Sequence, residues 1–114
     1  MPYQHTDLAD GRWQFLSLVE QMANIGSEVE RTISWRKKNK LDYSQRAFFR
    51  ALELIDLTIL FNHQAPILKE VCRLRENLVD SFFADNTFGT TDETWQNYFK
   101  AFNWVARDQH SKKN

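Results

Sequence analysis

Residues 66–83 read Pro-Ile-Leu-Lys-Glu-Val-Cys-Arg-Leu-Arg-Glu-Asn-Leu-Val-Asp-Ser-Phe-Phe, and their apolar side chains recur at helical spacing. One face of the predicted helix is apolar except for an arginine at its middle, and its members are Leu68, Val71, Arg75, Leu78 and Phe82. A buried guanidinium without a carboxylate partner is very costly, so we expect Arg75 to pair with an acid. The preceding segment supplies Glu53 and Asp56, which lie between apolar residues on one face of another predicted helix.

Helical periodicity and capping residues divide the whole chain into four helices with short connections. The expected helices cover about residues 10–38, 43–61, 66–84 and 91–107. No segment alternates polar and apolar residues as a strand would, and the chain holds only three glycines and two prolines. The sequence therefore predicts an all-α fold, an antiparallel up-down four-helix bundle in a single domain of residues 1–114. Residues 1–9 and 108–114 are expected to be flexible ends.

The predicted helix ends carry residues suited to capping. Asp10 is expected to cap the first helix, and capping boxes are expected at Asp42–Gln45 and Thr90–Glu93. The run Trp-Arg-Lys-Lys-Asn-Lys at residues 35–40 favours a helix end, because cations stabilise the negative end of the helix dipole, and Asn39 suits the C-cap. The same run is also compatible with a contact to nucleic acid, but a solvated helix end is the simpler interpretation.

Three residues carry expectations about packing. Gly26 lies in the apolar seam of the first helix, where it either permits close approach of another helix or is simply tolerated in a long helix. Cys72 is interpreted as a small core residue. Phe88 is expected to fold down from a polar loop over one end of the core. Aromatic side chains left uncovered on the first and fourth helices would favour a homodimer.

Composition and charge limit the class of protein. Apolar residues make up 42% of the chain and aromatic residues 14%, which is enough to build a core. Lys+Arg and Asp+Glu both number 15, so the net charge is zero, and this balance disfavours a general nucleic-acid binder. The single cysteine excludes an intramolecular disulfide. The first residues lack a signal-peptide pattern and no apolar run could span a membrane, so a cytoplasmic location is expected.

Familiar catalytic and metal-binding patterns are missing from the sequence. There is no glycine-rich phosphate loop and no cysteine pair, and His5, His63 and His110 are not spaced as metal ligands. We therefore expect no metal and no cofactor.

The remaining candidate site is the polar group on the second and third helices. It is either an ion-pair network that fixes helix register or a pocket for a small anion or a partner's side chain. Glu28 and Arg31 of the first helix are placed to join it from the edge of the seam. The candidate ligand-binding residues, with neighbours in the last loop and helix, are Glu53, Asp56, Arg75, Arg73, Glu76, Asp85 and Tyr98.

A resemblance covers about residues 13–107. Its stretches are residues 24–31, Trp35, residues 50–58, residues 73–76 and the Asp-Asn, Gly-Thr-Thr, Trp and Tyr-Phe positions of residues 85–99. They resemble a family of small, functionally uncharacterised bacterial helical proteins. The resemblance implies a helical fold and gives no indication of an activity. The four-helix plan is also distantly similar to HEPN domains and to the helical partners of minimal nucleotidyltransferases. HEPN ribonucleases space their Arg and His further apart than Arg107 and His110, which are three positions apart, so ribonuclease activity is not implied.

Three functions remain open at this point. Neutral charge, a surplus of aromatic residues and the lack of a nucleophile–base set favour a non-catalytic interaction module, a homodimer that also admits another protein as partner. The second is a HEPN-like RNA- or nucleotide-associated protein that uses Arg73, Arg75 or Arg107 on phosphates. The third is a small-ligand binder with a charged pocket between the second and third helices.

Overall fold

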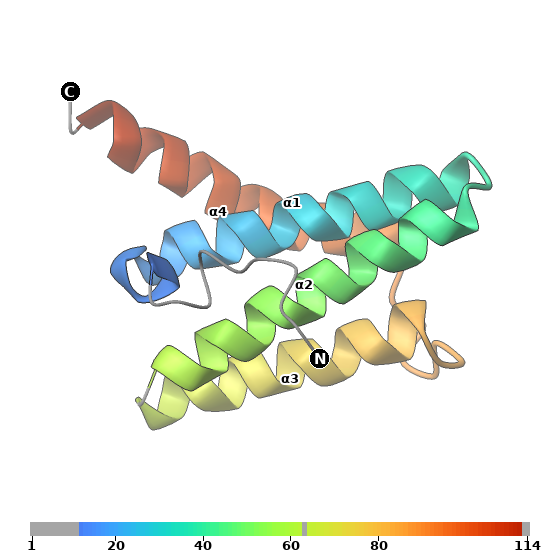
Figure 1. Cartoon of the computed structure of the whole chain (residues 1–114), viewed down its shortest axis with the longest axis horizontal. Helices are drawn as coiled ribbons and strands as arrows, with labels where there is room; N and C mark the ends of the chain where they lie inside the picture. Colours follow the sequence, from blue (N-terminus) through green and yellow to red (C-terminus); the bar gives the residue numbers. More distant parts are fainter. Residues whose placement is uncertain (1–11, 63, 113–114) are drawn as a thin grey trace.

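The computed structural model describes residues 12–62 and 64–112, with side chains up to residue 108. Its elements are the 3-10 turn η2 (Trp13–Phe15) and the helices α1 (Leu18–Lys37), α2 (Leu41–Phe61), α3 (Ala65–Phe82) and α4 (Asp92–Lys112). No strand occurs in these two ranges. Successive helices run in opposite directions, and α1 packs against both α2 and α4 (Figure 1). The predicted all-α four-helix bundle is confirmed.

The first long helix begins later than the sequence predicts. Ser17 is its N-cap: the hydroxyl accepts a hydrogen bond from Glu20 N at 3.1 Å, and the Glu20 carboxylate accepts one from Ser17 N at 3.2 Å. Ser17 is thereby held in extended backbone conformation, with a ψ of 159°, and the helix cannot continue toward residue 10. Trp13 lies in η2 instead. Asp10, the predicted cap, lies outside the described residues.

The turn between α1 and α2 is tighter than predicted. Asn39 adopts the left-handed conformation with a φ of 60°, as expected near a helix C-cap. The next helix therefore starts at once, and Ser44 N donates to Lys40 O at 3.0 Å. The predicted capping box of Asp42 is wrong, because Lys40 is the N-cap and makes no side-chain capping bond. Asp42 lies in the first turn, where its charge still suits the positive end of the helix dipole.

Asp80 organises the loop between α3 and α4. Its carboxylate accepts hydrogen bonds from Thr87 N at 2.8 Å and from Phe88 N at 3.1 Å. The loop is held by its backbone, and the Phe88 side chain is 69% exposed, so the expectation that it covers the core is wrong. The cap of α4 lies one residue later than predicted, since the Thr91 hydroxyl accepts from Thr94 N at 3.1 Å. The helix then continues to Lys112, beyond the predicted end at residue 107.

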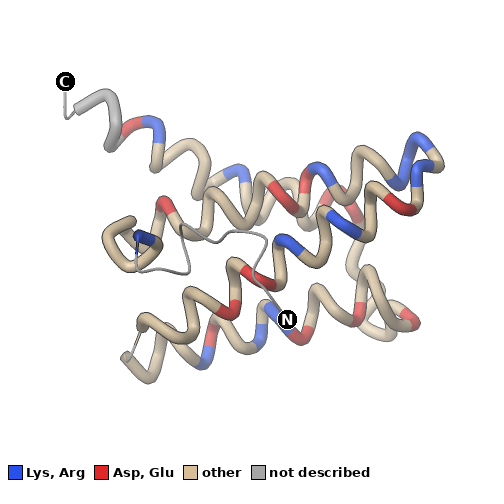
Figure 2. Tube along the Cα trace, in the orientation of Figure 1, with Lys and Arg blue, Asp and Glu red and all other residues tan. Residues whose placement is uncertain are grey.

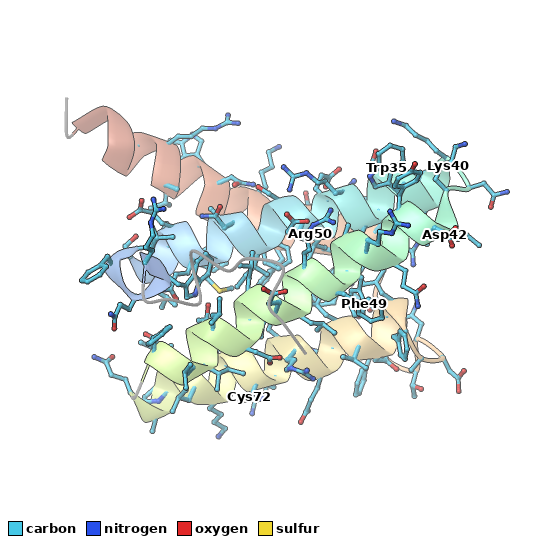
Figure 3. The ribbon with its side chains drawn as sticks, in the orientation of Figure 1. Trp35, Lys40, Asp42, Phe49, Arg50 and Cys72 are labelled. Carbon is cyan, nitrogen blue, oxygen red and sulfur yellow. The ribbon has the colours of Figure 1, made fainter. Side chains whose placement is uncertain are left out.

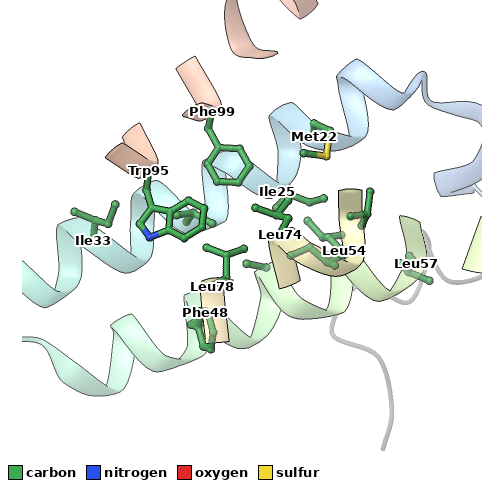
Figure 4. Close-up of a cluster of buried hydrophobic side chains, with 14 of the residues drawn as sticks. Met22, Ile25, Ile33, Phe48, Leu54, Leu57, Leu74, Leu78, Trp95 and Phe99 are labelled. Carbon is green, nitrogen blue, oxygen red and sulfur yellow. The ribbon is translucent and has the colours of Figure 1, made fainter. Parts of the chain in front are cut away.

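All four helices contribute to one core (Figure 4). Its buried helical side chains are Met22, Ile25, Val29, Ile33, Phe48, Ala51, Leu54, Ile55, Leu57, Val71, Leu74, Leu78, Trp95 and Phe99. Trp13 of η2 joins them with 0% exposure. Its indole Nε1 donates to Thr58 Oγ1 at 3.0 Å, and its carbonyl accepts from Gln21 Nε2 at 3.0 Å. These bonds tie η2 to α2 and α1.

Gly26 lies where α1 and α4 approach each other closely. A Cβ atom added there would lie 2.7 Å from Phe99 Cβ and 2.8 Å from Phe99 Cγ. Real Cβ atoms do not approach another carbon so closely, and Phe99 Cβ is fixed to the α4 backbone. Of the two interpretations of Gly26, close approach of another helix is therefore the one that the structure supports.

The face that α3 presents to the core differs slightly from the predicted one. Val71, Leu74 and Leu78 are buried, so Leu74 takes the central place that the sequence pattern gave to Arg75. This rotation leaves the guanidinium at the edge of the core, where solvent lowers the cost of its charge. Cys72 lies on the outer side and is exposed, so its interpretation as a core residue is wrong. None of the helices in the described ranges is both long and apolar enough to cross a membrane.

Candidate functional site

Arg75 and Asp56 form an ion pair between α3 and α2. Arg75 Nε lies 2.8 Å from Asp56 Oδ1, and Nη2 lies 3.5 Å from Oδ2, which confirms the predicted pairing. The hydrogen bond to Asp56 raises the pKa of the Arg75 guanidinium, against the lowering effect of partial burial. The two side chains are 40% and 51% exposed, so the pair lies on the surface.

The other predicted site residues are spread over the molecule. Glu53 lies one turn before Asp56 on α2 and is half-buried, whereas Arg73, Glu76 and Asp85 are exposed. Arg73 lines a hollow between α3 and α4, and Tyr98 faces the same hollow. The structure thus brings Asp56 to Arg75 and Arg73 to Tyr98, and a ligand pocket between the second and third helices stays a prediction.

The exposed ion pair leads to a prediction of small effect. Replacing Arg75 with alanine is expected to lower the free energy of unfolding by less than about 1 kcal/mol, because solvent screens an exposed pair. Urea unfolding followed by circular dichroism measures this change. A loss of several kcal/mol would contradict a surface role and would mean that the pair fixes helix register.

Glu28 on α1 is a buried charge, with only 6% of the residue exposed. Its Oε1 accepts from Arg31 at 2.7 Å, and its Oε2 accepts from Arg50 of α2 at 3.0 Å. Both carboxylate oxygens are therefore satisfied, and the network joins α1 to α2, where Figure 3 labels Arg50. The sequence placed Glu28 and Arg31 at the edge of the apolar seam of the first helix, from where they could join the polar group. The link to Arg50 depends on the α1–α2 register, which spacing alone does not give.

The helices α3 and α4 diverge from the loop that joins them (Figure 1), and residues of both helices line a hollow. Two hollows of about 210 and 220 Å³ share Glu70 and Tyr98 in their walls. Burial raises the pKa of the Tyr98 phenol, and the Glu70 carboxylate adds to this rise. One hollow has a polar rim that includes Arg73, and the other is mainly apolar.

Four phenylalanines gather where the start of α2 meets the end of α3. The rings of Phe48 and Phe83 lie 6.4 Å apart between centroids, those of Phe49 and Phe83 6.0 Å, and those of Phe48 and Phe82 5.6 Å. Phe48 is buried, but Phe49 is 41% exposed and Phe83 is 60% exposed. Figure 3 labels Phe49 on the α2 side facing α3. Together with Leu41, which is 61% exposed, we call these residues the aromatic patch.

A hollow of about 210 Å³ opens beside the aromatic patch, and Leu41, Phe48, Phe82 and Phe83 line its apolar part. Arg36 lies in the same wall, with its guanidinium 4.6 Å from the Phe82 ring centroid. That guanidinium also forms an ion pair with Asp92. The hollow therefore presents aromatic surface beside a cation that is already neutralised.

The aromatic patch lies elsewhere than the sequence suggested. Uncovered side chains were expected on the first and fourth helices, and α4 does expose Trp104 and Val105. The contiguous cluster, however, belongs to α2 and α3. Adjacent phenylalanines at positions 48–49 and 82–83 were the available signal, because neighbouring side chains point in different directions around a helix and one of the two can be left at the surface.

Comparisons with protein-family models, curated proteins and solved structures found no match for this chain. The all-helical fold is consistent with the HEPN resemblance, which stays a prediction.

Side chains suited to binding metal do not cluster in the described ranges, where no group of three His, Cys, Asp or Glu residues could hold an ion. His5 and His63 lie outside those ranges, and so does the side chain of His110.

Proposed function

We propose that this chain is a non-catalytic interaction module that pairs with a second copy of itself through the aromatic patch. The observation that carries the proposal is the exposure of Leu41 and Phe83 in the wall of one hollow, with the exposed Phe49 ring packed against Phe83. Large apolar side chains grouped at a surface favour burial against a protein partner. Aromatic rings set beside a pocket are also the kind of side chain that dominates binding energy at interfaces.

A second copy suits the aromatic patch because the patch has both projecting apolar side chains and a hollow that can receive such side chains. It has projecting side chains in Leu41 and Phe83, which are 61% and 60% exposed, and a hollow of about 210 Å³ beside them. In a two-fold dimer the same surface occurs twice, so each copy can insert its projecting side chain into the hollow of the other. The ion pair of Arg36 with Asp92 means that closing this contact buries no unpaired guanidinium there.

Substituting Phe83→Glu tests this proposal. Burial of each Phe83 ring at the interface contributes about 1.5 kcal/mol to the free energy of association. A two-fold dimer buries two such rings, so the variant should lose about 3 kcal/mol. The dissociation constant of the dimer should therefore rise about 100-fold. Light scattering coupled to size exclusion, over a dilution series, measures the change, and circular dichroism shows whether the variant keeps its helices.

Phe88→Glu is the matched control, because Phe88 is 69% exposed and lies on the loop outside the aromatic patch. It adds the same charge at a similarly exposed phenylalanine, so its dimer should be as stable as that of the unmodified chain. If both substitutions weakened the dimer equally, the change in net charge, and not the aromatic patch, would explain the effect. An unchanged dimer in Phe83→Glu would exclude the patch as the interface.

A further inference from the structure

The tip of the α1–α2 hairpin carries cations that form no ion pair within the described part of the chain. Lys37, Lys38, Lys40 and Arg46 are exposed there, and none of them takes part in an ion pair. Other cations do bond to carboxylates, namely Arg31, Arg36, Arg50 and Arg75. Figure 2 shows basic residues gathered at this end of the molecule, and Figure 3 labels Asp42 beside them. Although the whole chain has a net charge of zero, this tip is a local positive field.

Two aromatic rings are interleaved with these cations. The centroids of Trp35 and Tyr43 lie 4.9 Å apart, with 30° between the ring planes. Lys38 Nζ lies 5.2 Å from the Trp35 centroid, and Arg46 Cζ lies 5.6 Å from the Tyr43 centroid. The turn at Asn39 brings the two rings together from successive helices, and Figure 3 labels Trp35 on this tip. Tyr43 is 50% exposed, so part of the stack faces solvent.

We infer that this hairpin tip binds single-stranded nucleic acid. The exposed lysines and Arg46 contact phosphates, and the rings of Trp35 and Tyr43 stack with bases. Proteins that bind single strands combine these same two elements, a positive surface along the backbone and aromatic platforms for the bases. The site lies apart from Arg73, Arg75 and Arg107, the arginines that the sequence suggested for phosphate contacts.

The ring contacts favour a nucleic acid over another anionic partner. Stacking of a base on an aromatic ring is stronger than an exposed cation–π contact, so a base can replace Lys38 or Arg46 on its ring. The displaced cation remains beside the phosphate that adjoins the base. An acidic peptide or an anionic membrane would neutralise the cations but would offer no flat partner for Trp35 and Tyr43.

Fluorescence anisotropy with labelled single strands of about 12 nucleotides, oligo-dT and oligo-U, tests the inference. The full chain should bind at low salt. Four phosphate contacts predict a slope of about −3 for the logarithm of the binding constant against the logarithm of salt concentration. The triple variant Lys37→Gln, Lys38→Gln, Lys40→Gln should bind at least about tenfold more weakly. The slope of its binding constant against salt concentration, both as logarithms, should be about −1.

The matched control removes three exposed cations elsewhere, in the triple variant Lys69→Gln, Arg73→Gln, Lys100→Gln. It changes net charge equally and should retain the affinity and the salt slope of the unmodified chain. Tyr43→Leu tests stacking separately, because it removes a ring and keeps every charge. This variant should bind about tenfold more weakly with an unchanged salt slope.

Four results would overturn the inference. They are no binding of either oligonucleotide at low salt, equal losses in the tip and control triple variants, full affinity in Tyr43→Leu, and binding to phosphatidylserine vesicles without binding to oligonucleotides. Circular dichroism of each variant verifies that its helices are intact, so a lost signal is a property of the surface.

Discussion

Replacing Trp13 with alanine is expected to lower the free energy of unfolding by about 4 kcal/mol, the usual cost of deleting a buried tryptophan side chain. Trp13 is 0% exposed, so the substitution opens a cavity at the junction of η2 with α2. Thr58 Oγ1 also loses the indole N–H that lies 3.0 Å away. Urea unfolding followed by circular dichroism measures the change.

Trp13→Phe separates the two contributions to this effect. A phenyl ring fills most of the cavity but cannot donate to Thr58, so the expected loss is only about 1–2 kcal/mol. If Trp13→Ala instead cost less than about 1 kcal/mol, η2 would not be docked on the bundle in solution.

Gly26→Val is expected to lower the free energy of unfolding by about 3 kcal/mol, the upper end of the range for overpacking. The added side chain would start 2.7 Å from Phe99 Cβ, an atom that cannot move without the backbone of α4. The helices α1 and α4 must then separate along the part of the core where Phe99 is buried. Chemical denaturation measures the loss.

A control and a double-mutant cycle assign this loss to the close contact. Asn24→Val places the same β-branched residue at an exposed position of α1, where the change should stay within about 0.5 kcal/mol. Combining Gly26→Val with Phe99→Ala removes the ring atoms that lie 2.8 Å away but keeps Phe99 Cβ at 2.7 Å, so the double variant should relieve part of the clash and lose less than the sum of the two single losses. Full additivity would show that the Phe99 ring does not meet residue 26 in solution.

The course of the chain follows from its apolar spacing, but the helix boundaries depend on competition between capping residues. Periodicity located all four helices, but it left open whether Gly26 permits a close approach or is simply tolerated. Asp10 and Asp42 were reasonable caps by residue type, yet Ser17 with Glu20 and the left-handed Asn39 turn determine where α1 and α2 begin. Such choices differ by small energies and depend on local geometry that residue types do not specify.

The polar contacts were predictable only where one helix face decides them. The pairing of Arg75 with Asp56 followed from the cost of an unpaired charge near the core. A small rotation of α3 then moved Arg75 to the surface and put Leu74 in its place. Contacts between elements distant in sequence, such as Glu28 with Arg50, require the register of two helices, which the spacing within each helix leaves undetermined.

The aromatic patch and the hairpin tip show the same limit. Each combines residues from two helices that a pattern within one helix treats separately. The end of α3 meets α2 at Phe83 and Phe49, and the Asn39 turn places Tyr43 against Trp35. The residue types indicated apolar contacts and a basic helix end. Only the packing of the helices determines which of these residues lie together in the aromatic patch or at the hairpin tip.

The molar mass of the unmodified chain in solution is the most direct test of the central claim that the aromatic patch joins two copies. Sedimentation equilibrium over a dilution series should give a mass that rises with concentration toward twice 13.6 kDa and no further, because a two-fold contact closes on itself. A mass of 13.6 kDa at every concentration would contradict the account.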